Sequence, residues 1–366
     1  MEHQTTLSSE TFKPQFYRLS NESDKADFNV LKNLPYVEIY DEIEGQLTEL
    51  IKSLNPSERI VASEYPDRIL KHLNGQPISE YGVWVYYPWS KKLVHLLDEH
   101  EFIEVRTNRN RNKITREEQE KLKTKKIGII GLSVGQSIAL TIAMERTCGE
   151  LRLADFDTAE LSNLNRLRTG VHNLGLKKTI IAAREILEID PFITVKIFNE
   201  GLNDENIADF LTADGKLDLL VEVCDGLDIK VKSRLKSREF EIPVLMDTND
   251  RGMLDIERFD LEPDRPLLHG LLGRINPEKI SSLSNTEKME LIFRIVGSET
   301  ISQRLKDSVP ELGKTLNSLP QLASSVVLGG AISTDAARRI LLDQFQASGR
   351  FYVDTEELIK EDQVFI

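Results

Sequence analysis

Residues 127–137 read IGIIGLSVGQS, an apolar run followed by a turn that contains two glycines. The short apolar run at 127–130 is typical of a strand covered on both faces. After the turn, residues 138–143 place apolar side chains at helical spacing. A strand, a glycine-bearing turn and a helix in this order predict a nucleotide-binding unit, because the free N–H groups of a helix N-terminus favour an anion.

Strand-like and helix-like segments continue to alternate downstream of this turn. The expected strands are 151–154, 194–198, 217–223 and 243–246, and the expected helices are 176–189, 204–212 and 227–240. Alternation of this kind implies a parallel sheet wound by right-handed crossovers. The predicted fold class is therefore α/β, with a Rossmann-like, mostly parallel sheet that carries helices on both faces.

Two less regular regions flank the alternating segments. Residues 1–104 form a mixed α/β leader in which residues 81–87, YGVWVYY, predict an aromatic strand. Residues 105–366 hold the Rossmann-like domain and a C-terminal helical extension. Within the extension we expect helices at 286–296 and 316–345, the second interrupted by Gly329-Gly330, and a strand near residue 350, all packed onto the sheet.

Composition excludes several classes of protein. The formal net charge of −13 argues against broad nucleic-acid binding, because an acidic surface repels phosphate. No apolar stretch approaches the roughly 18 residues of a membrane span, and the polar N-terminus does not resemble a secretory signal. The two cysteines are too few for a zinc site built from paired CxxC motifs, and they fit a reducing compartment. We therefore expect a cytoplasmic protein without a membrane contact or a structural zinc.

The glycine turn alone does not decide the nucleotide. Gly131, Ser133 and Gly135 stand where a phosphate loop is expected, but Ser133 and Gln136 replace glycines of the GxGxxG pattern, and a tight turn without a ligand is the alternative. Asp155 ends the next strand, where a carboxylate can accept a hydrogen bond from a ribose hydroxyl. This arrangement suits NAD and an adenine nucleotide equally well.

Three later motifs decide between the nucleotides. Residues 155–166 read DFDTAELSNLNR, Gly175-Leu176-Lys177-Lys178 follows, and Val223-Cys224-Asp225-Gly226 ends a later strand. In this order they resemble the ThiF/MoeB/E1-like (ubiquitin-activating-type) adenylyltransferase superfamily, in which DxDxxxxSNLxR precedes GxxK and a strand-end Asp. The resemblance extends from about residue 106 to about residue 252.

The resemblance implies adenylation of a carboxylate with ATP and Mg²⁺. Cations that stabilise charge on the phosphates would come from Arg166 and Lys178, while Asp225 would be the oxygen ligand of the metal. Lys177 is the alternative to Lys178, although we expect it to be a solvated lysine. The expected nucleotide-binding residues are Gly131, Ser133, Gly135, Asp155, Asp157, Asn163, Arg166 and Lys178.

The family also places an arginine upstream of the first strand that reaches ATP across a dimer interface. Arg109 and Arg111 are the two candidates. Arg111 is preferred because residues 111–114, RNKI, resemble the family's Arg-Gln-Ile-Leu run. The resemblance therefore implies a homodimer.

The substrate implied by the resemblance ends in a carboxylate: the C-terminus of a ubiquitin-like or sulfur-carrier protein, a peptide, or a modified nucleoside. Some peptide-modifying relatives use a region like residues 1–104 to grip their substrate. Many relatives also form a thioester on a cysteine. Here Cys148 is expected to be buried, and Cys224 is not expected to be a nucleophile. Residues 247–252 follow a strand end and are candidates for the acceptor site.

Two other functions remain open from the sequence. An NAD-dependent oxidoreductase on the same fold would need a general acid such as histidine, and it would leave Arg166, Lys178 and Asp225 without a shared role. A non-catalytic partner subunit is expected to have lost these three residues, which this chain retains.

Overall fold

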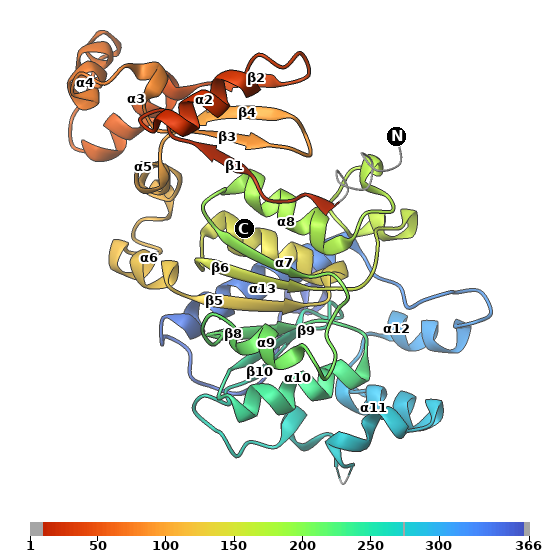
Figure 1. Cartoon of the computed structure of the whole chain (residues 1–366). Helices are drawn as coiled ribbons and strands as arrows, with labels where there is room; N and C mark the ends of the chain where they lie inside the picture. Colours follow the sequence, from red (N-terminus) through yellow and green to blue (C-terminus); the bar gives the residue numbers. More distant parts are fainter. Residues whose placement is uncertain (1–9, 274, 362–366) are drawn as a thin grey trace. The chain divides into compact units, whose positions relative to one another are not determined.

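A computed structural model describes residues 10–273 and 275–361 (Figure 1). The chain divides into two compact units. The smaller unit comprises residues 1–116 and 187–192, and the larger comprises residues 117–186 and 193–366.

The larger unit is built on a seven-stranded sheet with the strand order β11-β10-β9-β8-β5-β6-β7. The parallel strands are β5 (Lys126–Ile130), β6 (Glu150–Ala154), β7 (Thr194–Phe198), β8 (Leu219–Glu222) and β9 (Val244–Asp247). Two antiparallel strands, β10 (Met253–Glu257) and β11 (Gly349–Tyr352), extend one edge. The predicted α/β fold with a mostly parallel sheet is confirmed, whereas β10 was not expected from the sequence.

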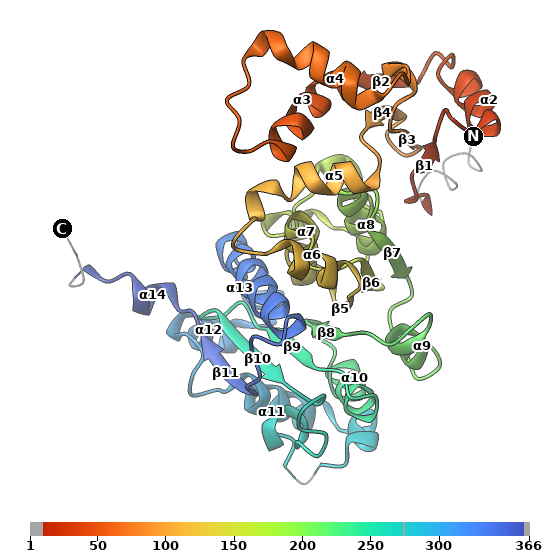
Figure 2. The same cartoon turned by 90° about the vertical axis from the view of Figure 1, so that its left-hand side faces the viewer.

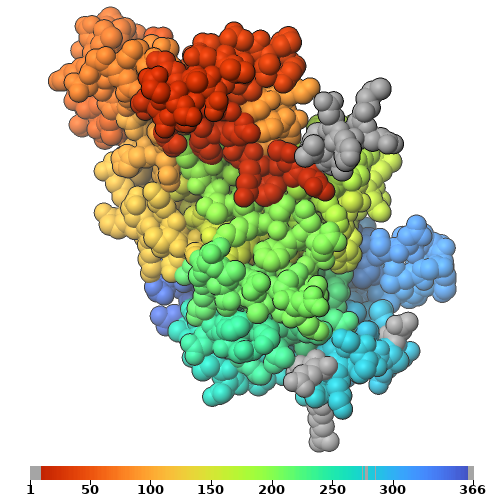
Figure 3. Space-filling model, viewed as in Figure 1, coloured from red at the N-terminus to blue at the C-terminus, as the bar shows by residue number. Residues whose placement is uncertain are grey.

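Helices cover both faces of this sheet. α7 (Leu132–Glu145) and α13 (Ala323–Leu341) pack against each other, whereas α10 (Leu227–Glu239) lies on the opposite side of the central strands (Figure 2). α10 adjoins α9 (Ile207–Thr212) on the face shown in Figure 3. The other α-helices that lie wholly or mostly in this unit are α6 (Arg116–Lys123), α8 (Lys178–Ile189), α11 (Asn285–Val296), α12 (Gln303–Ser308) and α14 (Thr355–Leu358).

The central strands are apolar because both of their faces are covered. Ile127 and Ile129 of β5 are completely buried, as are Leu219, Leu220 and Val221 of β8. Burial on both faces explains why these strands appear in the sequence as continuous apolar runs and not as alternating patterns. Over the described part of the chain, no helix has the length and apolar character needed to cross a membrane.

The smaller unit contains a four-stranded sheet with the order β1-β3-β4-β2. Its strands are β1 (Gln15–Tyr17), β2 (Glu38–Asp41), β3 (Val83–Tyr87) and β4 (Lys92–Leu96), and its helices are α2 (Glu22–Leu31), α3 (Ile43–Leu54), α4 (Tyr65–Leu73) and α5 (Glu99–Arg106). The aromatic strand predicted at 81–87 is β3, and the Trp84 ring stacks on His95 of β4 with centroids 4.2 Å apart. The edge strand β2 pairs in parallel with β4 and is exposed along its whole length.

Gly329 and Gly330 do not interrupt the last long helix, so this expectation was wrong. α13 runs through both glycines without a break. A Cβ on Gly329 would lie 2.1 Å from Asp247 Oδ2, and one on Gly330 would lie 2.5 Å from Ser137 Oγ. The two glycines therefore permit a close approach of α13 to β9 and α7.

Asp247, the last residue of β9, is buried where α13 crosses the strand. The residue is 4 % exposed, and Oδ2 has no hydrogen-bond partner among residues 10–273 and 275–361. Asn249 Oδ1 also lacks a partner and lies 3.1 Å from the Cβ position of Gly329. Burial raises the pKa of Asp247 to about 7, although the backbone N–H groups of Asn249 and Thr248 oppose this shift.

Replacing Asp247 by asparagine should remove a pH dependence of stability. The pKa of an aspartate in the unfolded chain is about 3.9. The free energy of folding that comes from protonation of the native carboxyl is therefore fully present below about pH 4. It is lost as the pH rises toward the native pKa of about 7. In urea denaturation between about pH 5 and about pH 7, the unfolding free energy of the wild type should therefore fall, relative to Asp247→Asn, by about 1 kcal/mol per pH unit on average. A difference that stays constant over this range would show that the native carboxyl is already ionised.

Candidate functional site

The carboxyl ends of the parallel strands bring the expected phosphate loop next to the end of β8. Gly131 follows β5 with a φ of 89° and caps α7. A Cβ on Gly131 would lie 2.8 Å from the Cα of Cys224. Only glycine fits here, both because of its backbone conformation and because the two chain segments touch.

Gly135 and Ser133, in the first turn of α7, have different surroundings. A Cβ on Gly135 would lie 2.7 Å from Ile129 Cγ2, so this glycine lets the helix approach β5 closely. The hydroxyl of Ser133 is buried and lacks a hydrogen-bond partner within the described residues. Ser133 thus leaves a hydroxyl unused at the end of the helix where an anion is expected.

Asp155 links the phosphate loop to the end of β6. Its Oδ2 accepts a hydrogen bond from the N–H of Leu132 at 2.6 Å, and its Oδ1 accepts one from the N–H of Asp157 at 2.8 Å. The side chain is 9 % exposed, and burial raises its pKa despite these hydrogen bonds and the nearby Lys178. Each carboxylate oxygen still has a lone pair with which it can accept a ribose hydroxyl.

Lys178 and Lys177 have separate partners. The ammonium group of Lys178 is 2.7 Å from Asp157 Oδ2, and the lysine side chain is 5 % exposed. Lys177 donates to the backbone carbonyls of Phe156 and Asn199 at 2.9 and 3.1 Å. Lys177 therefore ties backbone segments together and also lies 3.7 Å from the exposed carboxylate of Glu200, whereas Lys178 makes the close carboxylate contact, with Asp157.

The next segment carries Asn163 and Arg166. It forms the 3-10 helix Leu161–Asn165, in which the buried Asn163 accepts a hydrogen bond from the N–H of Glu160 at 3.1 Å. Arg166 donates from Nη1 to Asn165 Oδ1 at 2.9 Å, while its Nε is buried and has no partner in the part of the chain that the structure describes. The guanidinium group thus keeps donors that phosphate oxygens can accept.

Asp225 is exposed at the turn between β8 and α10. No group of three or more His, Cys, Asp or Glu side chains in the described residues is arranged to hold a metal ion. A single carboxylate beside phosphates nevertheless suits Mg²⁺, which is often held by one or two carboxylates together with substrate phosphates.

The cysteine before Asp225 is not activated. Burial, and next the carboxylate of Glu222, raise the pKa of the Cys224 thiol well above its ordinary value. Because the thiolate is the nucleophile, such a thiol is unreactive at neutral pH. Cys148 is completely buried.

The two candidate arginines upstream of β5 belong to the smaller unit. Arg109 is exposed in the 3-10 helix Asn108–Asn110. Arg111 is half-buried and forms an ion pair with Glu104. A role for either arginine at the nucleotide stays a prediction.

The structure adds residues that the motifs did not identify. Glu222, the last residue of β8, is completely buried and meets Lys230 of α10. The only signal in the sequence is an acidic residue that ends an apolar strand and is followed by basic residues on the next helix. In the segment considered for the acceptor, Asp250 accepts hydrogen bonds from Ser302, and Arg251 pairs with Asp354 at 2.5 Å.

Comparisons with known proteins were consistent with this geometry. Residues 107–246 match the model of the ThiF family. The chain is 44 % identical over 301 residues to the uncharacterized protein MT1398 of Mycobacterium tuberculosis (strain CDC 1551 / Oshkosh). The aligned region covers 80 % of this chain but only 42 % of that protein. It is 27 % identical over 203 residues to the molybdopterin-synthase adenylyltransferase of Haemophilus influenzae, covering 54 % of this chain and 80 % of that enzyme.

Among solved structures, the E. coli tRNA N6-threonylcarbamoyladenosine dehydratase TcdA in complex with ATP has a TM-score of 0.49 and 14 % identity. The match covers 68 % of this chain and 98 % of that one. The family match and the similarity to an adenylyltransferase agree: residues 107–246 of this chain form a region of the ThiF family of the E1-like adenylyltransferase superfamily.

Proposed function

We propose that this chain uses ATP to adenylate a carboxylate and releases pyrophosphate. The observation that carries the proposal is a continuous series of contacts at one sheet edge. It runs from the N–H of Leu132 at the phosphate loop through Asp155 and Asp157 to Lys178. Asp225 follows the neighbouring strand β8, whose end touches the same loop at Gly131.

In this proposal one group of residues at the sheet edge binds the ribose of ATP and another binds its phosphates. Asp155 accepts a ribose hydroxyl, and the N-terminal turn of α7 receives the phosphates. Lys178 is paired with Asp157 in the structure, so binding of the phosphates exchanges one anionic partner of the ammonium group for another. Asn163 and Arg166 approach the phosphates from the segment after β6.

The reaction is an in-line displacement at the α-phosphorus. A carboxylate oxygen of the substrate forms a bond to this phosphorus, the bond to the bridging oxygen of pyrophosphate breaks, and the leaving oxygen keeps the electron pair. Arg166 and Lys178 stabilise the negative charge that develops on the phosphate oxygens. Bound Mg²⁺, which Asp225 would hold, supplies further charge neutralisation. The raised pKa of Cys224 favours transfer of the acyl group without a thioester on this chain.

The proposed substrate is the C-terminal carboxylate of a ubiquitin-like or sulfur-carrier protein or of a peptide. We infer that the smaller unit recognises it. Its edge strand β2 leaves one side without a strand partner in the described sheet and exposes Ile39 and Tyr40. An extended peptide segment can pair with such an edge through its backbone.

We further propose a homodimer in which Arg111, or its alternative Arg109, serves the nucleotide of the partner chain. The exposed apolar side chains of Leu161 and Leu322 support a protein contact on the larger unit, with 70 % and 67 % of their surfaces accessible. Dimers with two-fold symmetry are the commonest oligomers, and in them each chain can complete the other's site.

Exchange of labelled pyrophosphate into ATP tests the chemistry directly. With Mg²⁺ and a scan of short and long carboxylate peptides and carrier proteins, we expect exchange that depends on a carboxylate. Arg166→Ala and Asp225→Ala should each lower the exchange rate by about 100-fold or more, because each removes charge stabilisation of the transition state. Lys236→Ala is the control and should retain the rate, because Lys236 pairs with Glu239 on the surface of α10. Tight binding of NAD(H) without binding of ATP would instead support the oxidoreductase, and ATP binding without exchange would support a non-catalytic subunit.

Mixing two inactive variants tests whether the arginine acts across the dimer. Arg111→Ala and Asp225→Ala should each be inactive alone. After the subunits exchange, a mixed dimer has one site with Asp225 from one chain and Arg111 from the other. Pyrophosphate exchange should therefore recover in the mixture, and the same mixture made with Arg109→Ala identifies which arginine is used. If neither mixture recovers activity, the proposed action across the dimer is wrong.

A further inference from the structure

A buried carboxylate lies beneath the turn that carries Asp225. Glu222 ends β8 and is completely buried. Its Oε1 accepts a hydrogen bond from the backbone N–H of Cys224 at 2.9 Å. The side chain thus folds back onto the chain two residues ahead and holds the residue directly before Asp225.

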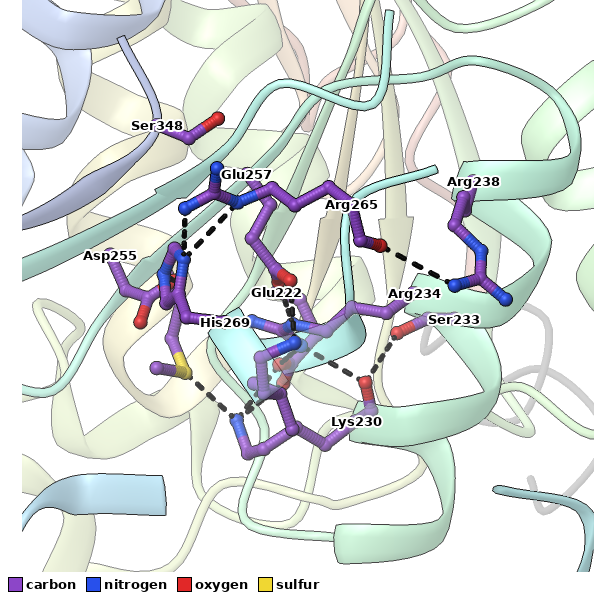
Figure 4. Close-up of polar contacts among 12 residues, drawn as sticks. Glu222, Lys230, Ser233, Arg234, Arg238, Asp255, Glu257, Arg265, His269 and Ser348 are labelled. Carbon is purple, nitrogen blue, oxygen red and sulfur yellow. Dashed lines mark hydrogen bonds and ion pairs between the residues drawn. The ribbon is translucent and has the colours of Figure 1, made fainter. Parts of the chain in front are cut away.

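Two cations on one face of α10 neutralise this carboxylate. The Nζ of Lys230 lies 2.9 and 2.8 Å from the two oxygens of Glu222, and Nη1 of Arg234 lies 2.5 Å from Oε2 (Figure 4). The two residues are four positions apart, which places them on the same side of a helix. Burial by itself raises the pKa of Glu222, but Lys230 and Arg234 outweigh it and lower the pKa to about 2. Glu222 is therefore ionised at neutral pH.

The network is anchored at its far end as well. Arg234 Nε donates to Glu257 Oε2 at 2.6 Å, and Glu257 Oε1 accepts the N–H of Leu268 at 2.6 Å. Leu268 and His269 have φ values of 50° and 54°, so this carboxylate holds a left-handed turn. His269 in turn contacts Asp255 through Nε2 at 2.9 Å (Figure 4).

Arg234 is therefore shared between two buried carboxylates, whereas Lys230 serves Glu222 alone among the contacts described. Lys230 has 14 % of its side-chain surface exposed, and its ammonium group also lies 3.4 Å from Met246 Sδ. Without Lys230, one guanidinium would have to neutralise both Glu222 and Glu257. Glu222 would then lose the cation that contacts both of its oxygens, directly beneath the Cys224 backbone.

The turn at 224–226 is held by a second contact besides the hydrogen bond to Glu222. The Cα of Cys224 is in contact with Gly131, where even a Cβ would be 2.8 Å away. A shift of Cys224 therefore changes the separation between the phosphate loop and Asp225.

We propose that Glu222 and Lys230 are positioning residues for Asp225: their ion pair fixes the turn at 224–226 beside the phosphate loop and so sets the affinity for Mg²⁺ in the adenylation reaction. This inference rests on the proposed function. Neither residue touches the reacting atoms; Lys230 acts on Glu222, Glu222 acts on the Cys224 backbone, and the backbone carries Asp225.

The test uses the 366-residue chain and three variants of α10. Lys230→Met removes the cation, Lys230→Arg restores it, and Lys232→Met is the control, because Lys232 lies on the same helix but pairs with Asp204 at 2.8 Å. Pyrophosphate exchange is measured against Mg²⁺ concentration at saturating ATP. Lys230→Met should raise the half-saturating Mg²⁺ concentration by about tenfold or more, as is typical for loss of a group that orients a metal ligand. Lys230→Arg should recover most of this loss, and Lys232→Met should match the wild type.

Amide hydrogen exchange at Cys224 gives a second result that does not depend on activity. In Lys230→Met this amide should exchange about tenfold faster than in Lys232→Met, while the amides of β5 keep their protection. If the wild type catalyses no pyrophosphate exchange, the proposed function fails, and this measurement still decides whether Lys230 fixes the turn. Unchanged protection at Cys224, or a uniform loss of protection across the sheet, would overturn the positioning role.

Discussion

The charge of Glu222 is the constraint on which much of the larger unit depends. A carboxylate at the end of a central parallel strand lies far from water, and it remains charged only if cations reach it. Lys230 and Arg234 meet it from α10, which fixes how this helix lies against β8. Arg234 then needs a second anion, and Glu257 of the antiparallel strand β10 provides it. One buried charge thereby links the end of β8, the first turns of α10 and the added edge of the sheet.

The same sheet edge holds a second ion pair, between Lys178 and Asp157, which is more open to solvent than the pair of Glu222 and Arg234. Lys178 is almost fully buried, yet its partner Asp157 is half exposed, with 50 % of its side-chain surface accessible. A buried ammonium group needs an anion, but a partly solvated carboxylate can release it when a phosphate arrives. By contrast, both oxygens of Asp155 are held by backbone N–H groups. The geometry thus combines a carboxylate that the backbone holds in place with a lysine whose partner is open to solvent; in the proposed function the first accepts the ribose and the second the phosphates.

Close approaches of neighbouring chain segments explain the glycines better than chain flexibility does. Gly131 lets the phosphate loop touch the end of β8, and Gly329 lets α13 lie across the end of β9. The second approach buries Asp247 without a partner for Oδ2 and raises its pKa to about 7. Dense packing at the edge of the sheet therefore has an electrostatic consequence, since burial raises the pKa of this carboxyl group from its ordinary range to near neutrality.

The sequence by itself determined the parallel α/β fold, because strands buried on both faces leave continuous apolar runs and the helices between them leave a different period. It also revealed the family motifs at 155–166, 175–178 and 223–226, because each motif is a short run of neighbouring residues. Only the tertiary structure showed that Glu222, Arg234 and Glu257 form one buried network, since residues 222 and 257 belong to strands that are separated by β9. The role of Gly329 was missed for the same reason. From helix propensity alone, two adjacent glycines predict a break in the helix. In the structure the helix is unbroken, and Gly329 is needed because a side chain there would collide with Asp247, 82 positions earlier in the chain.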